Sequence, residues 1–179
     1  SLHDALPISP RWAHCDDNHA WVEVFVDGEW HFLGACEPEE VLDTGWFSGP
    51  ANRAILIHTR NFSDYVKESN EEYLGKEGAL YYFNHTDFYG RTKLVKILVK
   101  DENGKPAAGA HIAVEILNMA EFFPAAVMIA DADGEVQMTL GLGDIRVRAF
   151  DGIRRAEAMM RIEEEDSLEL VLQDRKSVV

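Results

Sequence analysis

The most constraining feature of the sequence is a predicted β-hairpin over residues 18–33, NHAWVEVFVDGEWHFL. The dipeptide Asp27-Gly28 lies between two runs of β-branched and aromatic residues, and both central residues of a type I′ turn need a positive φ, which Asp and Gly adopt readily. With a two-residue loop, Val26 pairs with Glu29 and the register of the whole hairpin is fixed. Two antiparallel strands are therefore expected near the start of the chain.

This register divides the side chains of the hairpin between two faces, because successive residues of a strand point in opposite directions. The aliphatic face carries Ala20, Val22, Val24 and Val26, and we expect it to be the core. The mixed face carries His19, Trp21, Glu23 and Phe25. It places His19 at the open end of the hairpin, opposite Cys36.

The hairpin carries a recognisable motif. His-Ala-Trp-Val-Glu-Val at residues 19–24, followed by Gly-x-Trp at 28–30, resembles the histidine motif of transglutaminase-like proteins. This papain-related superfamily includes peptide N-glycanases and many bacterial thiol hydrolases. PRWAH at residues 10–14 and GACEPE at 34–39 are similar to a branch found in exported bacterial proteins. The resemblance covers residues 10–60 and implies the C-terminal strand half of a transglutaminase-like core, which is α+β in the full parent.

The resemblance also implies a catalytic arrangement. In such hydrolases a cysteine at a helix N-terminus attacks an amide carbonyl, a histidine accepts its proton and a carboxylate on the next strand orients the imidazole. His19 matches the histidine, and Trp12 and Trp21 are candidate substrate-binding residues, with ordinary core aromatics as the alternative. Gly34 stands where family members carry an Asp. Glu37 is the nearest acid and reaches the imidazole if the chain bulges after Gly34; by simple alternation it is an exposed acid instead.

The nucleophile is expected upstream of the sequence. Cys15 is not followed by a helix before the hairpin begins, and Cys36 lies on the strand that should supply the carboxylate. The chain as printed is therefore expected to be inactive. A disulfide between the two cysteines stays open, with free thiols favoured. The short spacing of His14, Cys15 and His19 disfavours a metal site, and we expect no metal or organic cofactor.

The two ends of the chain are related at the level of DNA. Residues 3–8, HDALPI, can be encoded by CAC GAC GCT CTT CCG ATC, and the reverse complement encodes residues 174–179, DRKSVV. This DNA is similar to a common sequencing adapter. We expect residues 1–9 and 174–179 to be translated adapter, and the natural segment to be a piece of a longer protein cut at both ends.

The net charge of −15 is the same with or without these ends, which hold two acids and two bases. Such acidity argues against nucleic acid as a partner, because phosphate contacts need Lys and Arg. The sequence contains no run of eighteen apolar residues, so no membrane-spanning helix is predicted. The resemblance implies a peptide or glycopeptide substrate and an exported protein, whether periplasmic, lipoprotein or extracellular; it leaves the oligomeric state open.

The rest of the chain predicts a second domain. Residues 54–59 should be a strand that continues the first sheet, and residues 66–92 a linker with the first strand of the next domain. From residue 93 to 173, short strand-like runs alternate with turn residues, which is typical of an antiparallel β-sandwich. The expected strands are 81–85, 92–100, 110–117, 127–130, 135–140, 145–150, 156–162 and 168–172. Their pattern resembles Ig-like, carboxypeptidase-regulatory and prealbumin-like sandwiches.

The chain is thus expected to be mainly β, with a partial transglutaminase-like domain at 10–65 and a sandwich at 93–173. The parent would be a cysteine hydrolase or acyltransferase acting on peptide or glycopeptide amides. Its rival is a binding or scaffold protein that has kept the fold and lost the triad. Gly34 in the Asp position favours the rival, and the retained His19 favours the enzyme.

Overall fold

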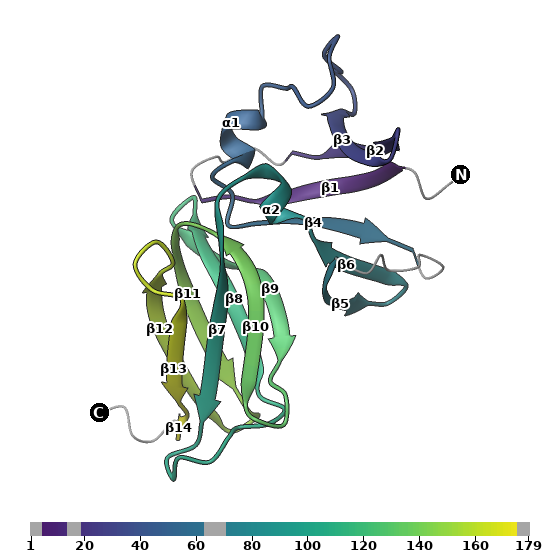
Figure 1. Cartoon of the computed structure of the whole chain (residues 1–179). Coiled ribbons are helices and arrows are strands. Elements are labelled where there is room, and N and C mark those ends of the chain that lie inside the picture. The colour runs from purple at the N-terminus through teal and green to yellow at the C-terminus, as the bar shows by residue number, and fades with distance from the viewer. Residues whose placement is uncertain (1–4, 14–18, 63–70, 175–179) are drawn as a thin grey trace.

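A computed structural model describes residues 5–13, 19–62 and 71–174 as a six-stranded sheet lying against a β-sandwich (Figure 1). The strand order in the first sheet is β3-β2-β1-β4-β6-β5, and all its neighbours are antiparallel. Its strands are β1 (Ala5–Arg11), β2 (Trp21–Val26), β3 (Glu29–Gly34), β4 (Leu56–Asn61), β5 (Glu72–Glu77) and β6 (Leu80–Asn84).

The predicted hairpin is confirmed in its strands, turn and register. β2 and β3 pair from Val26 with Glu29 to Trp21 with Gly34. Asp27 and Gly28 have φ values of 53° and 92°, as a type I′ turn requires. The expectation that β4 continues the same sheet is also confirmed, because β4 pairs with β1 and β6.

The expectation that the aliphatic face of the hairpin forms the core is wrong. Trp21 and Glu23 of the mixed face are buried, with 1% and 0% of their surface exposed, whereas Val26 is 41% exposed. The mixed face packs in an aromatic cluster with residues in and beside two short helices, α1 (Ser48–Ala51) and α2 (Thr86–Tyr89). Large aromatic side chains bury more apolar area than valines do, so the helices cover this face.

β1 lies inside the sheet, between β2 and β4. Its residues 5–9 are those that the DNA argument assigns to an adapter, and the structure pairs them through the backbone: Ala5 to Ile8 with β2, and Ile8 to Arg11 with β4. Ile8 is fully buried. The position of β1 therefore rests on backbone pairing to two strands and on the Ile8 side chain in the core of the first sheet.

The second half of the chain is a β-sandwich, so the mainly β expectation is confirmed: of the residues that the structure describes, 58% lie in strands and 5% in helices. One sheet has the order β10-β7-β13 and the other β14-β12-β11-β8-β9. All pairs are antiparallel except β13 with β7. The strands are β7 (Thr92–Lys100), β8 (His111–Asn118), β9 (Glu121–Ile129), β10 (Glu135–Gly141), β11 (Asp144–Phe150), β12 (Arg154–Arg161), β13 (Ser167–Val171) and β14 (Gln173–Asp174).

Residues 71–92, which the sequence suggested as linker and first sandwich strand, contribute mostly to the first sheet. β6 pairs with β4, and β5 pairs with β6. α2 follows β6 directly and leads into β7 of the sandwich. Only a few residues therefore separate the two parts. The sequence did not show this, because the place of β6 depends on its pairing with the distant strand β4, which no local pattern encodes.

The two parts meet at the end of β10. The Gly141 amide donates a hydrogen bond of 2.8 Å to the Ile55 carbonyl, and a Cβ on Gly141 would overlap the Ala54 carbonyl oxygen. Ile55 and Leu56 are buried in the sandwich core although they lie just before and within β4. The sandwich core is thus completed by residues of the first sheet. Among the described residues, no helix has the length and apolar character needed to cross a membrane.

Candidate functional site

His19 lies just before β2, where the hairpin opens, and its ring is surrounded by aromatic rings. The ring centroids of Trp46 and Phe47 are 4.6 Å and 5.0 Å from that of His19. Trp12 stacks on His19 with a centroid distance of 6.5 Å and an angle of 13° between the rings, and Trp21 lies 5.9 Å away. We name these five residues the His19 cluster: Trp12, His19, Trp21, Trp46 and Phe47.

The two predicted substrate-binding residues belong to this cluster. Trp12 and Trp21 are 4% and 1% exposed, and both pack in the core of the first sheet. The Trp21 indole N–H donates a hydrogen bond of 2.6 Å to the Tyr89 hydroxyl. Trp46 is 52% exposed, so it presents more surface to a ligand than either predicted residue. Trp46 was not among the substrate-binding residues predicted from the sequence, because its position next to Phe47 gives no separate signal.

Glu37 is exposed in the segment that follows β3. The backbone folds back over Gly34 there, so that a Cβ on Gly34 would lie 2.5 Å from the Glu37 carbonyl oxygen. Glycine is therefore the residue that fits at position 34, and an Asp would require the backbone to move. Cys36 is a free, exposed thiol. His14 and Cys15 lie outside the described residues.

A buried carboxylate and histidine form a pair that sequence reasoning missed. The Glu23 carboxylate contacts His85 Nδ1 at 2.6 Å and accepts a hydrogen bond from the Tyr89 hydroxyl, also at 2.6 Å. Glu71 lies 3.6 Å from His85 Nε2. Glu23, His85 and Tyr89 are 0%, 8% and 9% exposed. We name Trp21, Glu23, Glu71, His85 and Tyr89 the Glu23 network.

The Glu23 network explains how a carboxylate is tolerated in the core. Burial alone would lower the pKa of His85, but the hydrogen bonds and negative charges of Glu23 and Glu71 outweigh it and raise the pKa to about 9. The protonated imidazole then balances the buried carboxylate. Burial and the charge of Glu23 raise the pKa of Tyr89, so its hydroxyl stays protonated and donates.

A second histidine and carboxylate pair lies at the edge of the sheet. Asp43 contacts His31 Nδ1 at 2.7 Å and accepts a hydrogen bond of 2.9 Å from the Phe32 amide. Burial is the largest single influence and opposes ionisation, but the hydrogen bonds of His31 and the Phe32 amide together outweigh it and lower the pKa of Asp43. This pair fastens the loop after β3 to the strand, and so holds the segment that carries Glu37 and Trp46. Among the described residues, no group of three or more His, Cys, Asp or Glu side chains is arranged to hold a metal ion.

Comparison with known proteins adds little to this geometry. No protein-family model and no curated protein matches the chain. Among solved structures, a streptococcal ancillary pilin matches with 10% identity and a TM-score of 0.38 over 95% of this chain. The chain spans 62% of the length of that pilin chain. A TM-score this low supports no statement about function, and the fold class stated above, mainly β with a sandwich, rests on the structure itself.

Proposed function

We propose that the chain is the histidine-bearing part of a transglutaminase-like cysteine hydrolase or acyltransferase of an exported bacterial protein. The observation that supports this proposal most is the position of His19. It lies at the open end of a hairpin whose register agrees with the motif, beside the half-exposed ring of Trp46. The aromatic neighbours fix the imidazole ring, and the exposed ring of Trp46 offers a surface that a substrate would approach.

In this proposal the substrate is a peptide or glycopeptide amide. His19 acts as general base for a cysteine supplied by a part of the protein upstream of this sequence, and Glu37 orients the imidazole. Trp12 and Trp46 line the approach to His19. The chemistry needs no metal or organic cofactor, because the thiolate itself is the nucleophile.

A scaffold protein is the second candidate, and Gly34 is the observation that favours it. The family's Asp position is filled by a glycine, and the Glu37 carbonyl occupies the space in which an Asp side chain would start. In that case the His19 cluster would serve as an aromatic binding surface without catalysis. The sandwich is compatible with either candidate.

The coding DNA upstream of residue 10 distinguishes the enzyme from the scaffold protein. A cysteine that opens an apolar helix roughly 30 to 60 residues before His19 is the order that the enzyme proposal requires. Ser, Ala or Gly at that helix start would instead support the scaffold.

If the cysteine is present, the reconstructed protein should hydrolyse or transamidate a peptide amide, and His19→Ala should lower kcat/KM by at least about 1,000-fold. His111→Ala, an exposed histidine of β8, is the matched control and should retain full activity. A reconstructed protein in which His19→Ala matches the wild type would contradict the proposal.

A further inference from the structure

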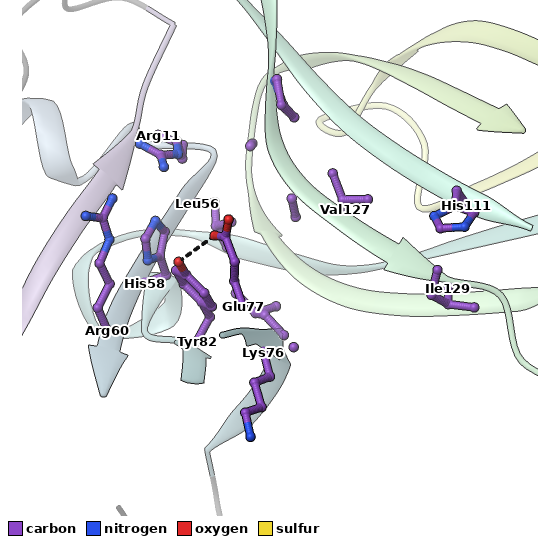
Figure 2. A pocket seen from close by; sticks show the side chains of 15 residues that line it. Arg11, Leu56, His58, Arg60, Lys76, Glu77, Tyr82, His111, Val127 and Ile129 are labelled. Carbon is purple, nitrogen blue, oxygen red and sulfur yellow. Dashed lines mark hydrogen bonds between the residues drawn. The ribbon is translucent and has the colours of Figure 1, made fainter. Parts of the chain in front are cut away.

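A cleft of about 770 Å³ lies between the first sheet and the sandwich (Figure 2). The end of β1 and strands β4, β5 and β6 line one side, and β9 with the start of β8 lines the other. The cleft shares no residue with the His19 cluster, so an inference about it stands independently of the proposed thiol chemistry.

The register of the first sheet gathers positive charge at one end of this cleft. Alternation along β4 places Leu56, His58 and Arg60 on one face. Arg11 pairs with Leu56 across the sheet, and Tyr82 pairs with Arg60. Figure 2 shows Arg11, His58, Arg60 and Tyr82 together at this end, while the Lys76 side chain extends away from them. The Lys76 ammonium donates instead to the Tyr81 hydroxyl at 3.1 Å.

Arg11 and Arg60 form no ion pair within the part of the chain that the structure describes, although the Glu77 carboxylate lies at the same end of the cleft (Figure 2). No carboxylate of the described residues lies within 4 Å of Arg11 or Arg60, and the Arg11 Nε atom is buried without a hydrogen-bond partner. Glu77 also lines the cleft, but it accepts a hydrogen bond of 3.1 Å from the Tyr82 hydroxyl. In a chain of net charge −15, such a pair of arginines is a local feature that the composition does not explain.

The positive charges act on one another. Burial and then the charge of Arg60 lower the pKa of Arg11. Burial, followed by the charge of Arg11, lowers the pKa of His58 to about 4, and Arg60 adds to this effect. An anion placed between the two guanidinium groups would relieve this repulsion and give the buried Nε atom a partner.

The other end of the cleft is mostly apolar, although the exposed imidazole of His111 lies there beside its strand partner Ile129 (Figure 2). This end is formed by the edge strand β9, from Pro124 to Val127 and at Ile129, together with Leu74 of β5. Val127 and Ile129 are each 55% exposed, which is high for aliphatic residues beside a cavity. An apolar group lying along β9 would remove this surface from water.

We propose that this cleft binds a small organic oxyanion, with its charged group between Arg11 and Arg60 and its apolar body along β9. Guanidinium groups match the geometry of carboxylate, sulfate and phosphate, and bind each of them through paired hydrogen bonds. A cleft of this volume can hold a drug-sized ligand, so a body with one ring or a short alkyl chain fits within it.

Calorimetric titration of the whole chain tests this proposal. The probes are three aryl anions: phenylacetate, phenyl sulfate and phenyl phosphate. Benzyl alcohol serves as the control that has the apolar ring without the charge, and inorganic phosphate as the control that has the charge without the ring. At least one aryl anion should bind at least tenfold more tightly than benzyl alcohol and inorganic phosphate do. Comparing the three anions identifies the preferred head group. If none binds more tightly than benzyl alcohol, the proposal is wrong.

Arg60→Gln is the informative variant, because Arg60 is exposed and its loss should leave the fold intact. It should weaken binding of the preferred anion at least tenfold. Arg53→Gln, which changes an exposed arginine outside the cleft, is the matched control and should bind as the wild type does. Equal affinity of Arg60→Gln and the wild type would overturn the proposal.

His58 supplies an independent readout of where the anion binds. A negative charge between Arg11 and Arg60 should raise the pKa of His58 above its value of about 4, as measured by NMR titration of the imidazole. An unchanged His58 titration at saturating anion would place the ligand elsewhere and contradict the proposed site.

Discussion

At the scale of single residues, the molecule shows how a buried acid depends on its neighbours. Glu23 is fully buried, and a carboxylate in that position is costly unless it is paired and hydrogen-bonded. His85 supplies the positive charge and Tyr89 a hydrogen bond. A Glu at the second position after the buried Trp21 gave no hint of this in the sequence, because its partners lie more than sixty residues further along.

The pairing of His85 predicts how stability depends on pH. The pKa of His85 is raised from 6.5 to about 9, so its contribution is complete below pH 6.5 and is lost as the pH rises through 9. We expect this contribution to fall by up to about 3 kcal/mol over that range. Urea unfolding at pH 6 and pH 9 measures it, and His85→Gln should remove most of the difference.

The control for this measurement is His111→Gln, because His111 is an exposed histidine outside the Glu23 network. It should keep the wild-type dependence on pH. If His85→Gln loses as much stability between pH 6 and 9 as the wild type does, His85 is not the group responsible.

At the scale of elements, turns decide which strands the sequence reveals. The hairpin at Asp27-Gly28 and most sandwich strands were predicted within one or two residues, because turn residues separate them, among them Asp133-Gly134 and Asp151-Gly152. β9 was predicted only from residue 127, although it begins at Glu121. The turn before it is Met119-Ala120, and both residues have a positive φ, 50° and 61°. Neither residue type indicates such a turn, so the first half of β9 was missed.

The same turn makes a prediction about stability. A residue with a Cβ pays a steric cost in the left-handed region, and glycine does not. Ala120→Gly should therefore raise the free energy of unfolding by up to about 1 kcal/mol. Ala113→Gly, in the middle of β8, should lower it instead, because glycine weakens a strand interior. Chemical denaturation of both variants checks the sign, and destabilisation by Ala120→Gly would contradict the turn geometry.

The buried face of the hairpin could not be predicted from the hairpin alone. Alternation along the strands predicts which side chains share each face of the hairpin, and this prediction was correct for both faces. Which face is covered depends on α1 and α2, whose buried residues come from segments far along the chain. For the same reason the contact of His19 with Trp46 could not be predicted from the hairpin motif, and the roles of His19 and Trp12 stay predictions.

At the scale of the whole molecule, Gly141 sets how closely the two parts approach. A side chain at this position would meet the Ala54 carbonyl oxygen, which is backbone and cannot rotate away. Gly141→Ala should therefore lower the free energy of unfolding by about 1–3 kcal/mol, as overpacking does. Urea unfolding gives the value.

Gly49→Ala is the matched control for this substitution. Gly49 lies in α1, and a Cβ there would have no neighbour within 4 Å. Its effect should be clearly smaller than that of Gly141→Ala, because Ala favours helix over Gly, while crowding of the new Cβ by the following Pro50 offsets that gain. Equal effects of the two substitutions would show that the sheet and the sandwich are not in close contact at Gly141.

The burial of Ile55 and Leu56 in the sandwich core has a consequence for recombination and engineering. A sandwich excised at residue 92 would leave behind two of the side chains that complete its interior. It would therefore be a poor building block for fusion to an unrelated partner, unless the segment that carries Ile55 and Leu56 were included in the fusion. Evolution faces the same limit, and gene rearrangements that keep the sheet and the sandwich together should be inherited more readily than those that split them.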